Sequence, residues 1–344
     1  MKHIIEVNSS LKQPSVKTIL VDEESAGQRL DNFLMRHLKG VPKTHIYRII
    51  RSGEVRVNKG RASADDRVGS GDAIRIPPVR LSERSLDKAH AMSLAKGGHT
   101  HVRDFTILME DDCLLAIDKP SGVSVHGGSG VSFGVIEQLR MARPEAKFLE
   151  LVHRLDRETS GILLIAKKRS ALKHLQNQFR ERETEKTYLC MVKGTWPVSK
   201  KVLNKPLHKY LLPDGERRVK VVSKDDPDGM PSVTLVKVKP TRAQSFSFLE
   251  VVIKTGRTHQ IRVHLANEGN PILGDDKYGD FDLNKKLMRS GSIPALKRMF
   301  LHAWRLSFKH PLTQVGVDLE APLSEDLAFF SALAAPPIAI GAES

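Results

Sequence analysis

The sequence predicts an α+β protein in which a large domain, built on a mainly antiparallel mixed sheet, follows a small α/β module. Short apolar runs bounded by Gly, Pro and polar residues recur through the second part of the chain, as is typical of strands. Few segments there have the apolar spacing of a helix. A stretch rich in Ser, Lys, His and Gly separates the two parts, and a length of 344 residues suits about two domains.

Composition and apolar spacing divide the chain into five segments. Residues 81–104 form the expected linker, and the tail is rich in Ala, Pro and Gly, a composition that buries too little apolar surface to fold. The segments are a disordered lead (1–18), the small module (19–80), the linker (81–104), the large domain (105–330) and a disordered tail (331–344).

The small module is predicted to contain two helices followed by a hairpin. The expected helices are Gln28–Leu38 and Lys43–Ser52, and the expected strands are Glu54–Asn58 and Ala73–Ile76.

The second of these helices is amphipathic. Helical spacing places Ile46, Ile49 and Ile50 on one face and Thr44, Arg48 and Arg51 on the opposite one. The apolar face is expected to pack, and the basic face either binds an anion or is simply solvated.

The large domain is predicted to consist mostly of strands. An amphipathic helix is expected at Ser170–Glu181, and a shorter one at Thr258–Asn267 with Thr258 as N-cap and Gly269 and Pro271 as stop signals. The expected strands are Ile107–Leu108, Cys113–Ile117, Phe148–Val152, Ile162–Ala166, Lys186–Val192, Val219–Val222, Val233–Val238 and Phe246–Ile253.

One loop of the large domain places a carboxylate between two arginines. Asp156 lies between Arg154 and Arg157 in a segment that joins two apolar strands. Each guanidinium would favour the ionised carboxylate, which suits a nucleophile or an electrostatic partner rather than an acid. Taken alone, such a tetrapeptide is more often a salt-bridged surface loop.

The charge of the chain indicates an anionic partner. A formal net charge of +15 and a pI near 9.8 favour nucleic acid. No apolar run reaches the roughly 18 residues of a membrane span, and residues 1–18 lack the apolar core of a signal peptide. Cys113 and Cys190 lie far apart in apolar runs, so we expect buried, reduced thiols in a cytoplasmic protein.

The sequence predicts neither a metal nor a cofactor. It contains no phosphate-loop or dinucleotide-binding motif, no H-E-x-x-H and no C-x-x-C pair. His259 and His264 are five residues apart and point in different directions on a helix or a strand, so they are poorly placed to share an ion.

Three segments, in this order, resemble the motifs of pseudouridine synthases that act on large-subunit ribosomal RNA. They are His153–Gly161, Lys186–Leu189 and Thr255–His264, and the resemblance extends from about Arg29 to about Pro322. Ser124–Gly130 and Leu273–Gly279 are most similar to the synthase C subgroup.

The small module is similar to the RNA-binding domain first seen in small-subunit ribosomal protein S-four. The order helix, helix, hairpin carries this similarity, with Arg29-Leu30-Asp31 at the first helix and Val55–Asn58 in the strand. The resemblance makes RNA contact by Arg48 and Arg51 the preferred alternative.

The resemblance implies a pseudouridine synthase fold and isomerisation of uridines in large-subunit (23S) ribosomal RNA, without a cofactor. It implies Asp156 as nucleophile, Arg262 as the residue that holds it ionised, and Tyr188 as a ring that stacks on the target uracil. Whether the carboxylate attacks the ribose or removes a sugar proton stays open. From spacing alone, Arg262 could instead be a snorkelling arginine and Tyr188 an ordinary core tyrosine.

The expected partner is large-subunit ribosomal RNA or its assembly precursor, bound by a monomer without membrane contact. The RNA-binding candidates are Arg29, Arg48, Arg51, Arg154, Arg157 and Lys186, and further candidates around the site are His153, Thr159, Gln260 and Lys277. Two alternatives remain: a non-catalytic ribosome-assembly factor on the same scaffold, and an RNA methyltransferase. The latter needs a glycine-rich cofactor turn that the sequence lacks.

Overall fold

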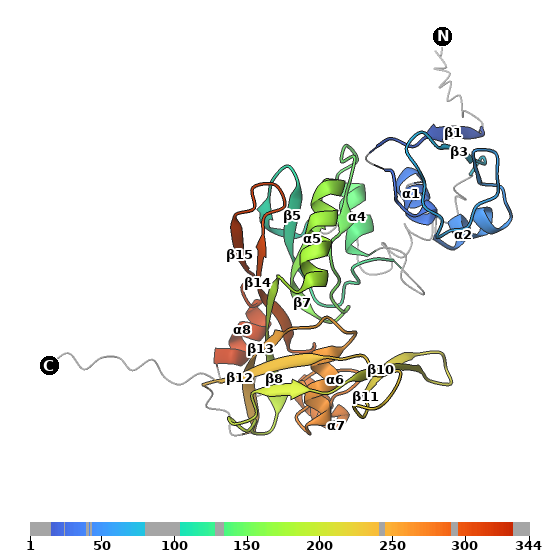
Figure 1. The fold of residues 1–344 in the computed structure, drawn as a ribbon. Coiled ribbons are helices and arrows are strands. Elements are labelled where there is room, and N and C mark those ends of the chain that lie inside the picture. Colours follow the sequence, from blue (N-terminus) through green and yellow to red (C-terminus); the bar gives the residue numbers. More distant parts are fainter. Residues whose placement is uncertain are drawn as a thin grey trace, which may run out of the picture. The chain divides into compact units, whose positions relative to one another are not determined.

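The computed structural model describes residues 15–23, 25–38, 41, 43–79, 104–127, 134–240, 245–289 and 295–332. These residues form two compact units, 15–79 and 104–332, each described here by itself (Figure 1). The expected linker lies almost entirely outside the described residues, as do positions 1–14 of the expected lead, positions 333–344 of the expected tail and part of the Ser124–Gly130 loop.

The small unit is a three-stranded antiparallel sheet with two helices, in the sheet order β1-β3-β2. Strand β1 begins at Lys17, inside the segment expected to be unstructured, because Lys17 and Thr18 pair with Ile76 and Arg75 of β3. This pairing depends on a distant strand and has no local signal. The elements are β1 (Lys17–Leu20), α1 (Leu30–His37), α2 (Lys43–Arg51), β2 (Arg56–Val57) and β3 (Ala73–Ile76).

Helix α2 has the two faces that its spacing predicts. Ile46, Ile49 and Ile50 are at most 5% exposed, while Arg48 and Arg51 are exposed. Strand β2 is shorter than predicted. Asn58 and Lys59 adopt positive φ angles of 50° and 69°, which turn the chain back so that the Val57 N–H bonds the Gly60 carbonyl at 3.1 Å.

The large unit contains a mixed, mainly antiparallel sheet, as predicted. Its strands run in the order β4-β5-β7-β14-β8-β13-β12-β9, with β6 added on β7 and β15 on β14. Within the described residues the pair β7 and β14 is parallel and the other strand pairs of this sheet are antiparallel. Its strands are β4 (Thr106–Glu110), β5 (Leu114–Lys119), β6 (Glu150–Leu151), β7 (Ser160–Ala166), β8 (Glu185–Lys193), β9 (Val202–Asn204), β12 (Val233–Lys239), β13 (Phe246–Ile253), β14 (Leu301–Lys309) and β15 (Gly316–Glu320).

A separate hairpin and five helices complete this unit (Figure 1). None of the helices within the described residues is both long and apolar enough to cross a membrane. The hairpin is β10 (Leu207–Leu211) with β11 (Arg217–Val221), and the helices are α4 (Val135–Ala142), α5 (Arg169–Glu181), α6 (Gln260–Asn267), α7 (Phe281–Arg289) and α8 (Glu325–Ala332).

Several boundaries differ from the prediction. Of the expected strand Phe148–Val152, Glu150–Leu151 is a strand within the described residues, and the Val152 N–H still bonds the Leu164 carbonyl at 3.0 Å. The N-cap of α6 is His259 rather than Thr258, and α8 extends to Ala332, into the expected tail. Helix α8 packs Leu327 and Phe330 against β8 and β13, which local composition does not reveal.

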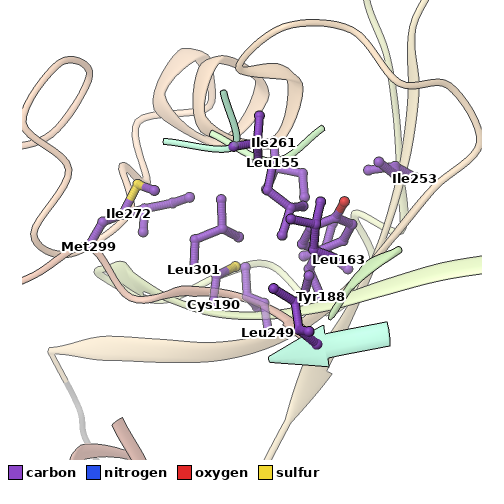
Figure 2. Close-up of a cluster of buried hydrophobic side chains, with 14 of the residues drawn as sticks. Leu155, Leu163, Tyr188, Cys190, Leu249, Ile253, Ile261, Ile272, Met299 and Leu301 are labelled. Atoms are coloured by element: carbon purple, nitrogen blue, oxygen red, sulfur yellow. The ribbon is translucent and has the colours of Figure 1, made fainter. Parts of the chain in front are cut away.

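The main apolar cluster surrounds the central strands. Leu155, Leu163, Tyr188 and Ile261 pack in it together with residues of β13 and β14, as Figure 2 shows. Leu155 and Ile261 are the immediate neighbours of Asp156 and Arg262 in the chain. The cluster therefore anchors both segments on which the expected site depends.

Gly161 lies where the Asp156 loop enters β7 and cannot accept a side chain. Its φ is +108°, and a Cβ atom would lie 2.2 Å from the carbonyl oxygen of Ala303 on β14. We expect Gly161→Ala to lower the free energy of unfolding by roughly 3 kcal/mol or more, because backbone strain adds to the clash. Urea unfolding checks this. Gly269→Ala is the matched control, since φ there is +83° but nothing lies within 4 Å. Equal losses in both variants would mean that the contact with Ala303 is unimportant.

Candidate active site

Asp156 lies in the loop between β6 and β7, with its side chain 19% exposed. The loop is fastened on both sides of this residue. Leu155 is buried in the apolar cluster, and the Thr159 N–H bonds the Asp156 carbonyl at 3.2 Å. The carboxylate therefore reaches solvent from a backbone that is held in place.

Lys119, the last residue of β5, also holds this loop in place. It is fully buried, and its Nζ donates to the carbonyls of Pro120 (2.9 Å), Val123 (2.9 Å) and Arg157 (3.1 Å). Burial lowers the pKa of Lys119 to about 7. Because three acceptors need three N–H donors, the ammonium form satisfies this arrangement best.

Arg262 is the cation nearest to Asp156 in the described part of the chain. It lies on α6, its side chain is 3% exposed, and its Nη1 is 3.6 Å from Asp156 Oδ2. The other edge of the guanidinium binds Asp275, with Nε 2.7 Å from Oδ2 and Nη2 2.6 Å from Oδ1. Asp276 accepts a further bond from Nη2 at 3.0 Å. Of the two alternatives for Arg262, the buried guanidinium paired with a carboxylate is correct.

Asp275 was not identified from the sequence, although it lies in the segment Leu273–Gly279. Its side chain is 1% exposed, and its Oδ1 also accepts the backbone N–H groups of Lys277 and Tyr278. Burial would raise the pKa of this carboxyl, but the bonds and charge of Arg262, together with the two backbone N–H groups, lower the pKa. A carboxylate that stays ionised keeps Arg262 in one orientation.

Arg154 and Arg157 were expected to favour the ionised form of Asp156, but neither forms an ion pair with it within the described residues. Arg157 donates from Nε to the Gly122 carbonyl at 3.1 Å and lies 3.3 Å from Glu158. Arg154 is exposed, and its side chain makes no hydrogen bond or ion pair with another described residue. Within the described residues, neither arginine forms an ion pair with the carboxylate between them.

Tyr188 lies on β8 within the apolar cluster and is 9% exposed (Figure 2). Its hydroxyl makes no hydrogen bond to another described residue. Burial and, second, the negative charge of Asp156 raise the pKa of its phenol. Tyr188 is therefore a neutral side chain whose pKa is raised by the charge of Asp156.

Comparisons with known proteins identify the family of this chain. A family model described as RNA pseudouridylate synthase matches residues 113–267. Ribosomal large subunit pseudouridine synthase C of Escherichia coli (strain K12) is 50% identical over 319 residues, which cover 91% of this chain and 95% of that protein. The chain belongs to the RNA pseudouridine synthase family.

Another relative supports the family, a solved structure supports the fold, and a second family model describes the small unit. Synthase C of Pasteurella multocida (strain Pm70) is 49% identical over 91% of this chain and 92% of its own length. The structure of human RNA Pseudouridylate Synthase Domain Containing 4 matches with a TM-score of 0.53 and 26% identity, over 72% of this chain and 97% of that one. A model of the S4 domain matches residues 28–74, so the small unit of this synthase is an S4 domain.

His259 approaches the carboxylate and Tyr278 contacts His259; neither was identified from the sequence as a site residue of this pseudouridine synthase. His259 Nε2 lies 3.9 Å from Asp156 Oδ2, and His259 Nδ1 lies 2.8 Å from the hydroxyl of Tyr278. The unusual backbone of His259, which precedes α6 with φ +53°, is a structural signal that the sequence does not carry.

The other residues expected around the site hold the synthase fold together. His153 Nε2 accepts the Leu164 N–H at 3.1 Å, its ring stacks on Phe179, and burial lowers its pKa to about 4. Gln260 donates to the Val233 carbonyl at 3.0 Å. The remaining three are Thr159, which is buried, Lys277, whose Nζ pairs with Glu216, and Lys186, whose Nζ lies 5.2 Å from the Phe179 ring centroid.

Of the basic candidates of the S4 domain, Arg51 lines a hollow of about 420 Å³ beside α2, together with Tyr47 and Arg61. Arg48 is exposed on the same helix. Arg29 is 42% exposed and forms a two-bond ion pair with Asp31, which also accepts the Tyr47 hydroxyl at 2.5 Å.

Two groups of possible metal ligands occur in the described residues, and neither includes Asp156: Asp111, Cys113 and His310, and His208, Asp226 and Asp228. In the first group, His310 Nδ1 accepts the Thr313 N–H at 3.1 Å, so the ring proton lies on Nε2 and is donated to Asp111 Oδ2 at 2.8 Å. Burial raises the pKa of Cys113 to about 11. This group is satisfied by its own hydrogen bonds.

Proposed function

We propose that this pseudouridine synthase isomerises specific uridines in large-subunit ribosomal RNA, and that Asp156 is its catalytic carboxylate. The observation that carries the proposal is a partly exposed carboxylate 3.6 Å from the buried guanidinium of Arg262. The RNA class is supported by the names of relatives about 50% identical over 91% of the chain, which are large-subunit synthases.

The reaction breaks the bond between ribose C1′ and uracil N1 and forms a bond between C1′ and uracil C5. The proton on C5 is lost and N1 gains one, so no atom is added and no cofactor is consumed. An ionised carboxylate serves either route, attack on C1′ or removal of the C2′ proton, because both need a free lone pair on an oxygen near the ribose.

Arg262 is proposed to orient this carboxylate and keep it ionised. Asp275 fixes the guanidinium from the opposite edge, so Asp156 meets a cation that is already positioned. Tyr188 is proposed to stack on the detached uracil, for which a neutral ring in the apolar cluster is suited.

Binding requires the target uridine to leave its stack, which costs a few kcal/mol and less in a loop. Arg154 and Arg157, both exposed beside Asp156, are proposed to hold the backbone phosphates around the flipped nucleotide, and Lys186 is a weaker candidate for the same role. We further propose that the protein acts as a monomer, in the cytoplasm, on the RNA or its assembly precursor.

The direct test is pseudouridine mapping. Large-subunit RNA from cells lacking the protein should lose pseudouridines, and the purified protein should restore them without added cofactor. Small-subunit RNA and transfer RNA are the control substrates. If the protein binds large-subunit RNA but forms no pseudouridine in any of the three, the alternative of a non-catalytic assembly factor is correct.

The S4 domain is proposed to increase the affinity for RNA without taking part in the reaction. In full-length protein, Arg48→Gln combined with Arg51→Gln should weaken RNA binding and flatten the log–log dependence of affinity on salt by about 1.4, at ~0.7 per phosphate contact with single-stranded RNA. The single-turnover rate at saturating enzyme should stay unchanged. Lys17→Gln on β1 removes an exposed charge elsewhere in this unit and is the control. An unchanged salt slope would mean that the basic face of α2 is only solvated.

A further inference from the structure

His259 lacks two features that usually stabilise the residue before a helix, a capping side chain and a favourable φ angle. It occupies the N-cap of α6, where Ser, Thr, Asp or Asn usually cap the helix, and its side chain makes no capping bond. Its φ of +53° lies in the left-handed region, which is unfavourable for a residue with a side chain. Such outliers persist where the surrounding structure needs them, so the contacts of the imidazole are informative.

The imidazole contacts the hydroxyl of Tyr278 through Nδ1. The Tyr278 hydroxyl oxygen accepts the backbone N–H of Val219 at 3.0 Å and lies 2.8 Å from His259 Nδ1. The hydroxyl proton is therefore available for donation to Nδ1. Nδ1 then carries no proton, and the proton of the neutral ring lies on Nε2.

Nε2 faces the proposed catalytic carboxylate. It lies 3.9 Å from Asp156 Oδ2, the same oxygen that Arg262 Nη1 approaches at 3.6 Å. The other oxygen, Oδ1, has no hydrogen bond or ion pair to another described residue. Two electropositive groups near one oxygen, both beyond hydrogen-bond distance, favour an orientation of the carboxylate in which Oδ1 is available to the ribose.

Arg262 and His259 are positioned by the same short segment of the chain. The Tyr278 N–H bonds Asp275 Oδ1 at 3.0 Å, and Asp275 also binds Arg262. The Arg262 guanidinium lies 5.3 Å from the centroid of the Tyr278 ring. The short segment Asp275–Tyr278 therefore sets the positions of both Arg262 and His259.

We infer that His259 is a positioning residue for Asp156, presenting its Nε2–H to Oδ2, and that Tyr278 selects the tautomer that makes this possible. The inference rests on the proposed catalytic role of Asp156. It adds a neutral donor beside Arg262, so the direction of the carboxylate depends on two contacts rather than on one long ion pair. Substrate binding is expected to shorten both contacts.

Three substitutions separate the parts of this inference. His259→Asn tolerates the left-handed backbone but is too short to reach Asp156, whereas His259→Gln retains an amide donor with the necessary reach. Tyr278→Phe removes the hydroxyl alone. His264→Gln is the matched control, because His264 lies on the same helix, is 1% exposed and bonds Thr234 and Lys205 instead. Tyr210→Phe, at an exposed tyrosine of β10, is the control for the tyrosine.

Single-turnover pseudouridine formation at saturating enzyme is the measurement, together with the enzyme concentration at half-saturation and the unfolding temperature. We expect His259→Asn to slow the single-turnover step roughly tenfold or more, with half-saturation unchanged within about twofold. His259→Gln should recover part of the rate. Tyr278→Phe should also be slow, and the double variant His259→Asn, Tyr278→Phe should be no slower than His259→Asn alone.

The outcomes distinguish this inference from the proposed function. Wild-type protein that forms no pseudouridine, or Asp156→Asn that retains activity, contradicts the proposed function itself. Active wild type and inactive Asp156→Asn, with His259→Asn at the wild-type rate, overturns the inference alone. It is also overturned if His259→Gln gives no recovery and His264→Gln slows the reaction equally, because both results describe a purely structural histidine.

Discussion

Asp156→Asn should abolish turnover and leave folding and RNA binding almost unchanged. Asparagine has nearly the same volume but cannot ionise, and the side chain is partly exposed, so little packing is lost. Arg262 keeps its two bonds to Asp275, so no buried cation is left unpaired. We expect the single-turnover rate to fall at least a thousandfold, or roughly 4 kcal/mol in the barrier.

The control for this prediction is Asp276→Asn. Asp276 also pairs with Arg262, at 3.0 Å, but its side chain is 61% exposed and its removal takes the same charge from the same guanidinium. It should retain most of the activity. If Asp156→Asn keeps more than about a tenth of the wild-type rate, a barrier change under ~1.4 kcal/mol, Asp156 is not the catalytic group.

The second large effect is expected at Arg262 and should not add to the first. Arg262→Gln removes the cation that orients Asp156, so it should lower the single-turnover rate by about a hundredfold or more. Because the two groups act as one unit, the double variant Arg262→Gln, Asp156→Asn should be hardly slower than Asp156→Asn alone. A double-mutant cycle with additive losses in the barrier would show that the two residues act separately.

Arg262→Gln also leaves Asp275 buried without its partner, which should lower the free energy of unfolding by about 3 to 5 kcal/mol. The rates are therefore measured well below the unfolding temperature. Arg262→Lys provides a second test if the first variant does not fold. A lysine keeps the charge near Asp275, but it lacks the planar guanidinium that reaches Asp275 and Asp156 from different edges. It should fold and remain slow.

Features encoded in consecutive residues were predicted well. Strands Ala73–Ile76 and Phe246–Ile253 have the predicted bounds, and the two faces of α2 are as expected. The periodicity of helices and strands depends on neighbouring positions in the chain, so it can be recognised from the sequence alone. Boundaries set by distant partners were missed, among them β1, which exists because β3 lies beside it, and α8, which packs on β8 and β13.

The sequence by itself determined the family, through three ordered motifs, and the resemblance proposed Asp156, Tyr188 and Arg262 as its site residues. Only the tertiary structure decided what surrounds the carboxylate. Arg154 and Arg157, its neighbours in the chain, form no ion pair with Asp156 within the described residues. Arg262 of α6 and His259, which precedes this helix, lie 3.6 and 3.9 Å from its Oδ2 instead. Electrostatic contact depends on distance in space, and the packing of Leu155 and Ile261 in one apolar cluster sets that distance.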